Sequence, residues 1–446
     1  MTLNGSARTL DIPSGRIRIL QAKYRDMFLA LLLIGPSVLG GCNRNTSSRH
    51  APSDVLRISR PGYEAMDRWL LAEIAAFEKD HPGKRISYEP VPGEEYLIKI
   101  QTAIAARDEP DAYTIAGQWV PKFARGNLLD VPPQEIQNKI RRDYVSSSVN
   151  YCSYQDVVYG FPYEGGSRVV LYNKQLVAEA GIEKEPETWE ELALAAQKCT
   201  KFDRFGRMIQ EGFAIYAVGL PPDFVCAVAA LIWSNGGGFM NEDETEFLLD
   251  DPRAVEALQF FVDLIYRYKC GSMSFISKEE AFASGRAAYE IAGPWEVSNL
   301  KILAPEMEIG AFLIPPKKRG DPIYVDNSPW LWVVSQNSTR KEEAYEFLEW
   351  VQTKRAQLDL VKQLGVTPYR LDALEDPYFK TDPVQAVFAE SNRHIRMRPR
   401  IWWFEIERML GTQMEMALLG MKSPLAAMQD GIRDIRRQMR IRQEAQ

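Results

Sequence analysis

The sequence predicts an α/β fold with two lobes, and three observations lead to this prediction. Short apolar segments alternate with amphipathic helical segments between residues 55 and 115, an order typical of a largely parallel sheet with helices on both faces. A similar mixture of strands and helices follows residue 169, and a Gly- and Pro-containing bend separates the two blocks. The 446 residues, 46% hydrophobic and 26% charged, fit a globular chain of two or three domains.

The first block predicts three strands and two helices. The strands are expected at 55–59, 86–90 and 111–115, and the helices at 66–77 and 96–106. Met66, Leu70, Ile74 and Phe77 recur at helical spacing in the first helix. Ligands of such sheets lie beyond the carboxyl ends of the strands. The turns after these strands, at 60–64, 91–95 and 117–119, are therefore candidate binding segments.

The bend between the blocks lies within residues 159–174, Y-G-F-P-Y-E-G-G-S-R-V-V-L-Y-N-K. Pro162 favours an extended conformation of the residue before it. Gly165 and Gly166 allow backbone angles that other residues avoid. Residues 169–171 are β-branched and apolar and predict a buried strand. The chain is therefore expected to pass from one strand to another with Glu164 at the bend.

The second block predicts more helix than the first. Thr188 and Glu191 form a capping-box pattern at the start of a helix. Helices are expected at 189–200, 225–233, 252–268, 277–283, 340–353, 401–419 and 424–442, and strands at 212–218, 308–313 and 326–334. We expect residues 308–313 to form the strand that returns to the first lobe. Each lobe would then consist of two separated pieces of chain.

The segment Y-G-F-P-Y-E-G-G-S-R-V-V-L-Y-N-K-Q-L-V-A-E-A-G-I-E-K-E-P-E-T-W-E-E-L closely resembles the extracellular solute-binding proteins of bacterial ABC importers. The resemblance is to the sugar-binding branch that includes maltose-binding protein, and it covers nearly the whole chain after the N-terminal segment. It implies a type II-like periplasmic binding protein fold, with hinge crossings near Glu164, Ile309 and Leu364. The first lobe would comprise 54–162 and 311–364, and the second 163–310 and 365–446.

The first 41 residues predict a secretory signal. Basic residues precede an apolar stretch, residues 27–39, which is short for a membrane-spanning helix. The following Leu-Gly-Gly-Cys resembles a bacterial lipobox, which implies that Cys42 is acylated and becomes the mature first residue. Residues 42–53 would be a polar tether, and lipid chains on Cys42 would hold the protein on the cell membrane. A plain signal peptide with an incidental cysteine is the alternative.

Composition and motifs argue against several other functions. The net charge of −6 argues against a nucleic-acid binder that uses a basic field. The sequence contains no phosphate-binding P-loop, no G-x-S-x-G and no H-E-x-x-H, and it has only three histidines. We therefore expect no cofactor, no metal site and no catalytic residues. The four cysteines after Cys42 lack a C-x-x-C pair, so they are either disulfide-bonded or buried thiols.

The resemblance implies specific ligand-binding residues where the segments match. Carboxylates and amides exchange hydrogen bonds with sugar hydroxyls, and an aromatic plate covers the apolar face of the sugar ring. The expected residues are Gln118, Trp119, Glu164, Asp223, Phe224, Trp295, Asp326, Asn327, Trp402 and Trp403. Arg168 departs from the family pattern, and its guanidinium raises the alternative of an acidic or phosphorylated ligand.

The resulting hypothesis is a monomeric, lipid-anchored receptor that delivers a sugar or oligosaccharide to an ABC permease on the outer side of the cell membrane. Three alternatives stay open. A carbohydrate-active hydrolase would need two carboxylates at a fixed separation. A receptor for amino acids, peptides or anions would place Arg168, Arg60 or Arg286 in the cleft. A sensory binding module would have the same sequence features and would partner with a kinase.

Overall fold

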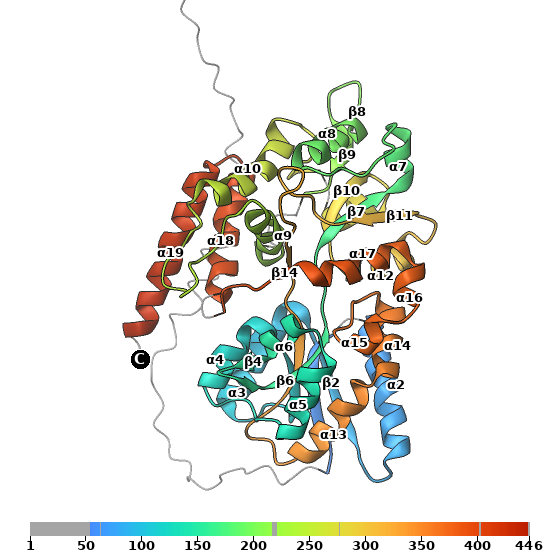
Figure 1. Cartoon of the computed structure of the whole chain (residues 1–446), viewed down its shortest axis with the longest axis vertical. Helices are drawn as coiled ribbons and strands as arrows, with labels where there is room; N and C mark the ends of the chain where they lie inside the picture. The colour runs from blue at the N-terminus through green and yellow to red at the C-terminus, as the bar shows by residue number, and fades with distance from the viewer. Residues whose placement is uncertain (1–53, 63, 216–220, 276, 401–402, 445–446) are drawn as a thin grey trace, which may run out of the picture. The chain divides into compact units, whose positions relative to one another are not determined.

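The computed structural model describes residues 54–446, except for residues 63, 216–220, 276, 401–402 and 445–446. Residues 54–446 contain two five-stranded sheets, in the orders β2-β1-β3-β13-β6 and β11-β7-β10-β9-β8 (Figure 1). We call the first sheet and the helices packed on it the first lobe, and the second sheet with its helices the second lobe. The predicted two-lobed α/β fold is confirmed.

The first sheet is mainly parallel. Its strands are β1 (Leu56–Gly62), β2 (Ile86–Pro92), β3 (Ala112–Ala116), β6 (Gly160–Glu164) and β13 (Trp330–Val334). β1 pairs in parallel with β2 and β3, whereas β13 lies antiparallel between β3 and β6. All five residues of β3 and of β6 are buried, because helices cover both faces of the sheet.

The second sheet contains β7 (Val169–Asn173), β8 (Lys201–Phe202), β9 (Met208–Phe213), β10 (Ala287–Ala292) and β11 (Ile309–Phe312). β9 and β10 are parallel, and β7 runs antiparallel between β10 and β11. β7 and β13 thus have a common property. Each is the first long strand after the chain crosses between the lobes, and each runs against its neighbours in the sheet.

The helices agree with the predicted pattern in their main features. The longer ones are α2 (Glu64–Asp80), α3 (Gly93–Ala106), α5 (Gln134–Asp143), α8 (Trp189–Cys199), α9 (Pro221–Ser234), α10 (Pro252–Tyr266), α12 (Pro294–Leu303), α13 (Lys341–Val351), α14 (Lys354–Leu364), α17 (Pro383–Ser391), α18 (Trp403–Leu418) and α19 (Pro424–Glu444). Thr188 caps α8 as predicted, because its Oγ1 accepts from the Glu191 N–H at 3.2 Å, while the Glu191 carboxylate accepts from the N–H of Glu187, one residue before the N-cap. In Figure 1, α18 and α19 lie side by side as the two red helices.

The short elements complete the fold. They are η1 (Gly117–Trp119), α4 (Val120–Arg125), α6 (Ser146–Cys152), β4 (Ser153–Tyr154), β5 (Val157–Val158), α7 (Lys174–Glu179), α11 (Lys278–Ala283), β12 (Val325–Asp326), α15 (Leu371–Leu374), α16 (Tyr378–Thr381), η2 (Asn392–His394) and β14 (Ile395–Arg396). β12 and β14 pair in parallel and form a small ladder of their own. The predicted strand at 326–334 is therefore two strands, β12 and β13, with an irregular segment between them.

The crossings between the lobes correct two sequence expectations. The first crossing joins β6 to β7 through residues 165–168, as expected. The strand predicted at 308–313 does not return to the first lobe, because β11 pairs with β7 in the second sheet. The return comes later, through residues 313–329. The third crossing also lies after Leu364, because Val366 and Tyr369 still pack in the core of the first lobe, whereas Val384 packs on the second sheet.

Each lobe has its own apolar core. The first sheet and its helices share one cluster of buried side chains, and the second sheet has a cluster on each face. In the described part of the chain, no helix combines the length and the apolar character that crossing a membrane requires. The cysteines described are buried free thiols: Cys152, Cys199, Cys226 and Cys270. Cys42 lies outside the described residues.

Gly165 in the first crossing allows a close approach that no side chain permits. A Cβ atom at this position would overlap the ring and hydroxyl of Tyr369, which donates a 2.7 Å hydrogen bond to Asn327 Oδ1.

We predict that Gly165→Ala lowers the free energy of unfolding by roughly 1–3 kcal/mol, because the buried tyrosine must move. Gly238→Ala is the matched control. A Cβ atom added at Gly238 would have its nearest neighbouring atom 3.5 Å away, so this variant should change stability by no more than about 0.5 kcal/mol. Urea denaturation measures both, and equal effects would contradict the prediction.

Glu211 is a buried carboxyl in β9. Burial raises its pKa to about 8 from the ordinary 4.5, while a hydrogen bond from the Ser272 backbone and the charge of Arg286 oppose the rise. Between these two pKa values the folded state binds more protons than the unfolded state, so this group makes stability fall as pH increases. The parent protein should therefore lose stability as the pH rises from about 4.5 to about 8, and this loss should be smaller in Glu211→Gln, which lacks the carboxyl. Melting temperatures of both proteins across this range test it, and parallel profiles would refute the assignment.

Candidate functional site

A pocket of about 700 Å³ is lined by residues of both lobes. Its volume falls in the range of small-molecule sites. Aromatic rings, amides, hydroxyls and charged groups all contribute to the lining: Ala65, Ala116, Gln118, Trp119, Glu164, Gly165, Gly166, Arg168, Cys226, Trp295, Ser298, Asn299, Lys301, Ile302, Ser328, Trp330, Gln363, Leu364, Val366, Arg398 and Glu407.

The first-lobe wall of the pocket is aromatic. β3 ends at Ala116, and η1 follows it at once, so Gln118 and Trp119 stand at the carboxyl end of this strand. Trp330 begins the antiparallel β13 directly opposite Ala116. The rings of Trp119 and Trp330 meet edge to face, with centroids 5.7 Å apart. The start of the reversed strand and the ends of its neighbours therefore bring two tryptophans and an amide to one wall.

Glu164 ends β6 on the same edge of the first sheet. It pairs with Trp330 across the ladder and is 8% exposed. Nη2 of Arg60 lies 3.7 Å from Glu164 Oε1, and the Arg60 guanidinium lies over the ring of Tyr163 at 5.7 Å. Arg60 is itself buried, and its positive charge offsets the negative charge of Glu164 inside the protein. The carboxylate is thus a fixed acceptor at the pocket.

The second-lobe wall centres on Trp295, the second residue of α12. A Cβ atom on Gly166 would lie 2.8 Å from the indole, so a glycine here lets the ring lie against the first crossing. The Arg168 guanidinium lies 5.3 Å from the Trp295 ring centroid, in cation–π geometry. Ser298 and Asn299 follow one helical turn after Trp295 and line the pocket with it.

The rest of the wall is a network of buried charges around Asp326. Arg398 donates from Nε and Nη2 to the two oxygens of this carboxylate, the first at 2.6 Å. Arg168 Nη1 lies 3.6 Å from Asp326 Oδ2. Arg398 also lies 3.3 Å from Glu407 Oε1 and donates to the Cys226 sulfur at 3.0 Å. Burial raises the pKa of Glu407 above its ordinary value, and the charge of Arg398 opposes this rise.

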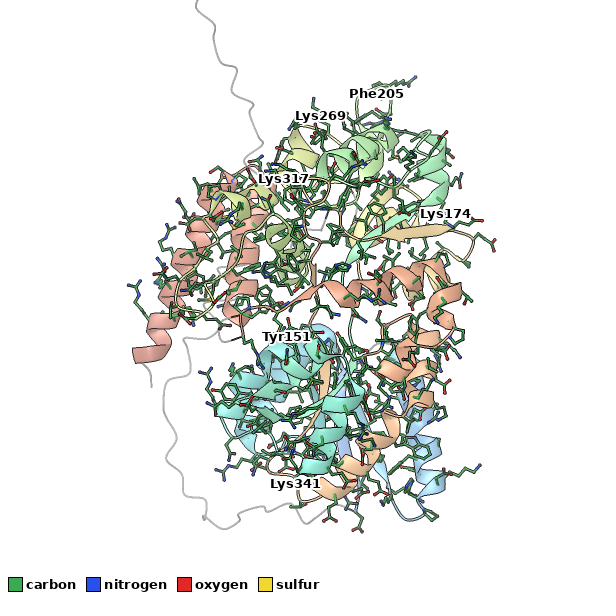
Figure 2. All side chains as sticks on the ribbon, viewed as in Figure 1. Tyr151, Lys174, Phe205, Lys269, Lys317 and Lys341 are labelled. Carbon is green, nitrogen blue, oxygen red and sulfur yellow. The ribbon has the colours of Figure 1, made fainter. Side chains whose placement is uncertain are left out.

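Tyr151 connects this network to the first lobe. Its hydroxyl accepts a 3.0 Å hydrogen bond from the Arg398 backbone N–H. Figure 2 labels Tyr151 at the side of the first lobe that faces the second. The guanidinium of Arg400 reaches the Ser153 carbonyl, while its backbone N–H donates to Glu244 at 2.8 Å. The segment before α18 is thus hydrogen-bonded to residues of both lobes.

Of the predicted ligand-binding residues, Gln118, Trp119, Glu164 and Trp295 line the pocket. Asp326 and Asn327 lie just behind it, fully buried, and bind Arg398 and Tyr369 respectively. Their position near the site was anticipated, but their side chains hold other side chains of the wall.

Two predicted contacts need correction. Phe224 is 3% exposed and packs edge to face on Phe261 with centroids 4.9 Å apart. Trp403 has no exposed surface, packs against Phe239, and presents a ring face to Arg398 at 4.8 Å. Both point into the apolar core of the second lobe, so neither is available to stack on a ligand. Of the remaining predicted residues, the structure describes only the backbone of Asp223, within α9, and Trp402 lies outside the described residues.

The sequence analysis missed several residues of the wall. Arg398 and Glu407 flank the predicted Trp402 and Trp403 in sequence, but no local pattern marks them as pocket residues. Ser298 and Asn299 could have been found, because residues three and four positions after Trp295 share its face of α12. Of the arginines expected for an anion receptor, Arg168 lines the pocket and Arg60 lies behind Glu164, whereas Arg286 contacts Phe275 and the Ile209 carbonyl elsewhere.

The donor set suits reversible recognition of a polar molecule. Within the described ranges, no group of three or more His, Cys, Asp or Glu side chains is arranged to hold a metal ion. Flat tryptophan rings from both lobes provide apolar contact area, and amides, hydroxyls and a carboxylate provide hydrogen bonds. A ligand in this pocket would touch both lobes at once.

Two curated relatives of the chain are named as sugar-binding proteins. A maltotriose-binding protein of Pyrococcus abyssi is 26% identical over 325 residues, which are 72% of this chain and 67% of the relative. A multiple sugar-binding protein of Streptococcus mutans is 24% identical over 330 residues, 72% of this chain and 76% of the relative.

Solved structures show the same fold. A solute-binding protein of an ABC transporter from Thermotoga lettingae, bound to α-D-tagatose, gives a TM-score of 0.75 at 22% identity and covers 86% of this chain and 99% of that one. A substrate-binding protein from Listeria monocytogenes in complex with cycloalternan gives 0.76 at 21% identity, with 86% and 98% covered. The model of the bacterial extracellular solute-binding protein family matches residues 62–358, which is more than half of the 446 residues. The chain belongs to the family of bacterial extracellular solute-binding proteins.

Proposed function

We propose that this protein is the substrate-binding component of an ABC importer and captures a sugar or oligosaccharide in the pocket between its lobes. The observation that carries this proposal is the combination of Trp119, Trp330 and Trp295, from opposite walls, with Glu164 and Gln118. Aromatic plates on two sides favour flat sugar rings, and the carboxylate and amide accept from hydroxyls. The relatives that bind maltotriose, diacetylchitobiose and arabinooligosaccharides support the same ligand class.

Binding would be coupled to closure of the lobes. A ligand that contacts both walls stabilises the closed arrangement to the extent that it binds this arrangement better than an open one. The residues that absorb the motion would be those of the three crossings, since they join the two sheets. The closed form would then dock as a monomer on the permease subunits. No chemical step is part of this function.

The N-terminal segment would fix the location. Acylation of Cys42 would hold the lobes at the outer face of the cell membrane through the polar tether 42–53. Delivery to a permease needs no release from the membrane, because the receptor and the permease would share one surface.

The ligand-binding role predicts a loss of affinity in two variants. Glu164→Gln replaces a charged acceptor and should raise the Kd for the bound sugar by about tenfold to a hundredfold. Trp295→Ala removes a stacking plate and should raise it by at least roughly tenfold. Isothermal calorimetry against a panel of mono- and oligosaccharides, with product analysis of each mixture, provides the measurement.

Glu342→Gln is the control for these variants, because Glu342 is an exposed side chain of α13 outside the pocket lining. Its affinity should equal that of the parent protein. Heat of binding without products supports the receptor. Detection of sugar hydrolysis products would show that the protein is a hydrolase and would overturn the receptor function. Binding of amino acids or peptides with no response to sugars would overturn the proposed ligand class.

The anchor predicts a change of location with no change of affinity. Cys42→Ser should move the protein from the membrane fraction to the soluble extracytoplasmic fraction, since the acylated thiol is absent. Fractionation with immunodetection follows the location, and calorimetry of the released protein follows binding. A variant that stays in the membrane fraction would contradict acylation at this residue.

A further inference from the structure

Two arginines line a pocket that is proposed to bind sugars. Arg168 and Arg398 both contribute to the wall, and guanidinium groups there would ordinarily favour carboxylates or phosphates. The structure shows what opposes this preference. Asp326 lies immediately behind the wall with no exposed surface and makes contact with both guanidinium groups.

The geometry at Asp326 uses both carboxylate oxygens. Arg398 binds them side on, with Nε 2.6 Å from Oδ1 and Nη2 on Oδ2, and Arg168 Nη1 approaches Oδ2 at 3.6 Å. A planar fork of this kind is the arrangement in which a guanidinium binds a carboxylate or a phosphate most strongly. Asp326 therefore occupies on Arg398 the fork that an acidic ligand would use.

The two carboxylates that line the pocket, Glu164 and Glu407, also have cationic partners. Arg60 lies 3.7 Å from Glu164, and Glu407 lies 3.3 Å from Arg398. A ligand carboxylate brought to Arg168 or Arg398 would approach Asp326 and Glu407 as well, and like charges in a poorly hydrated site repel. A neutral hydroxyl meets no such repulsion and can still accept from the guanidinium N–H groups.

We propose that Asp326 is a specificity-determining residue: it neutralises Arg168 and Arg398 so that the pocket takes neutral sugars and disfavours acidic ones. The proposal rests on the function proposed above for the pocket. It also makes Asp326 a residue that sets ligand class without lining the pocket itself.

Asp326→Asn tests the proposal, because the amide keeps the size of the side chain and removes its charge. Sulfate is the probe, and tryptophan fluorescence reports it, since Arg168 lies over Trp295 and Arg398 over Trp403. We expect the variant to bind sulfate saturably, with a Kd at least about tenfold lower than that of the parent protein. Identical titrations of the two proteins would overturn the proposal.

Glu290→Gln is the matched control. Glu290 is another fully buried carboxylate, paired with Lys278 at 2.9 Å, and it does not line the pocket. Glu290→Gln should have the same affinity for sulfate as the parent protein, although this variant also loses a buried ion pair. The double variant D326N/R398Q should lose the sulfate response gained in D326N, which assigns that response to the guanidinium of Arg398.

Glu407→Gln keeps the proposal testable if Asp326→Asn does not fold, as judged by circular dichroism. It removes the second carboxylate that contacts Arg398 and should strengthen sulfate binding in the same direction. No gain in sulfate binding in Glu407→Gln would then count against the proposal.

Sugar selectivity gives an independent readout. A neutral disaccharide and the same disaccharide with one uronate should exchange their order of affinity in Asp326→Asn. Failure of the parent protein to bind any sugar would overturn the proposed function, whereas normal sugar binding with unchanged selectivity in the variant would overturn only the role of Asp326.

Discussion

The contact of Asp326 with Arg168 and Arg398 is the interaction on which the site depends. Arg168 belongs to the first crossing, Asp326 to the second, and Arg398 to the segment between β14 and α18. One buried carboxylate thus joins three stretches of chain that are far apart in sequence. Removing one partner of a buried ion pair leaves an uncompensated charge, which is strongly destabilising. Pocket wall and interlobe connections therefore share one set of charges.

The fold positions this network through strand direction. In each sheet, the first long strand after a crossing, β7 or β13, runs against its neighbours. As a result, the start of β13 at Trp330 lies beside the ends of β3 and β6. Gln118 follows the end of β3, and Glu164 is the last residue of β6. The pocket lies beyond the carboxyl ends of these strands, which is where ligands of such sheets are expected. The reversed strand adds residues from its amino end to the same edge.

The sequence predicted the fold class and the part of the site that lies on local motifs. The family resemblance implied Glu164 and Trp295, and both line the pocket, where a strand ends beside a Gly- or Pro-containing turn. Trp403 was misassigned because a tryptophan at the start of a helix can face either the pocket or the core, and the choice depends on Phe239, which is distant in sequence. Arg398 and Glu407 were missed for the same reason: their partners come from other segments. Long-range pairing of this kind leaves no periodic signal in a single sequence.

The burial of the thiols has a practical consequence for observing the lobes. Cys152, Cys199, Cys226 and Cys270 are buried, Cys226 at the wall of the pocket, and burial raises the pKa of each thiol. Since the thiolate is the reactive form, these four sulfurs should react slowly with alkylating dyes. A pair of cysteines placed on exposed positions of the two lobes in a chain that lacks Cys42 would then carry donor and acceptor fluorophores selectively. Energy transfer between such dyes would follow the opening and closing of single molecules in real time.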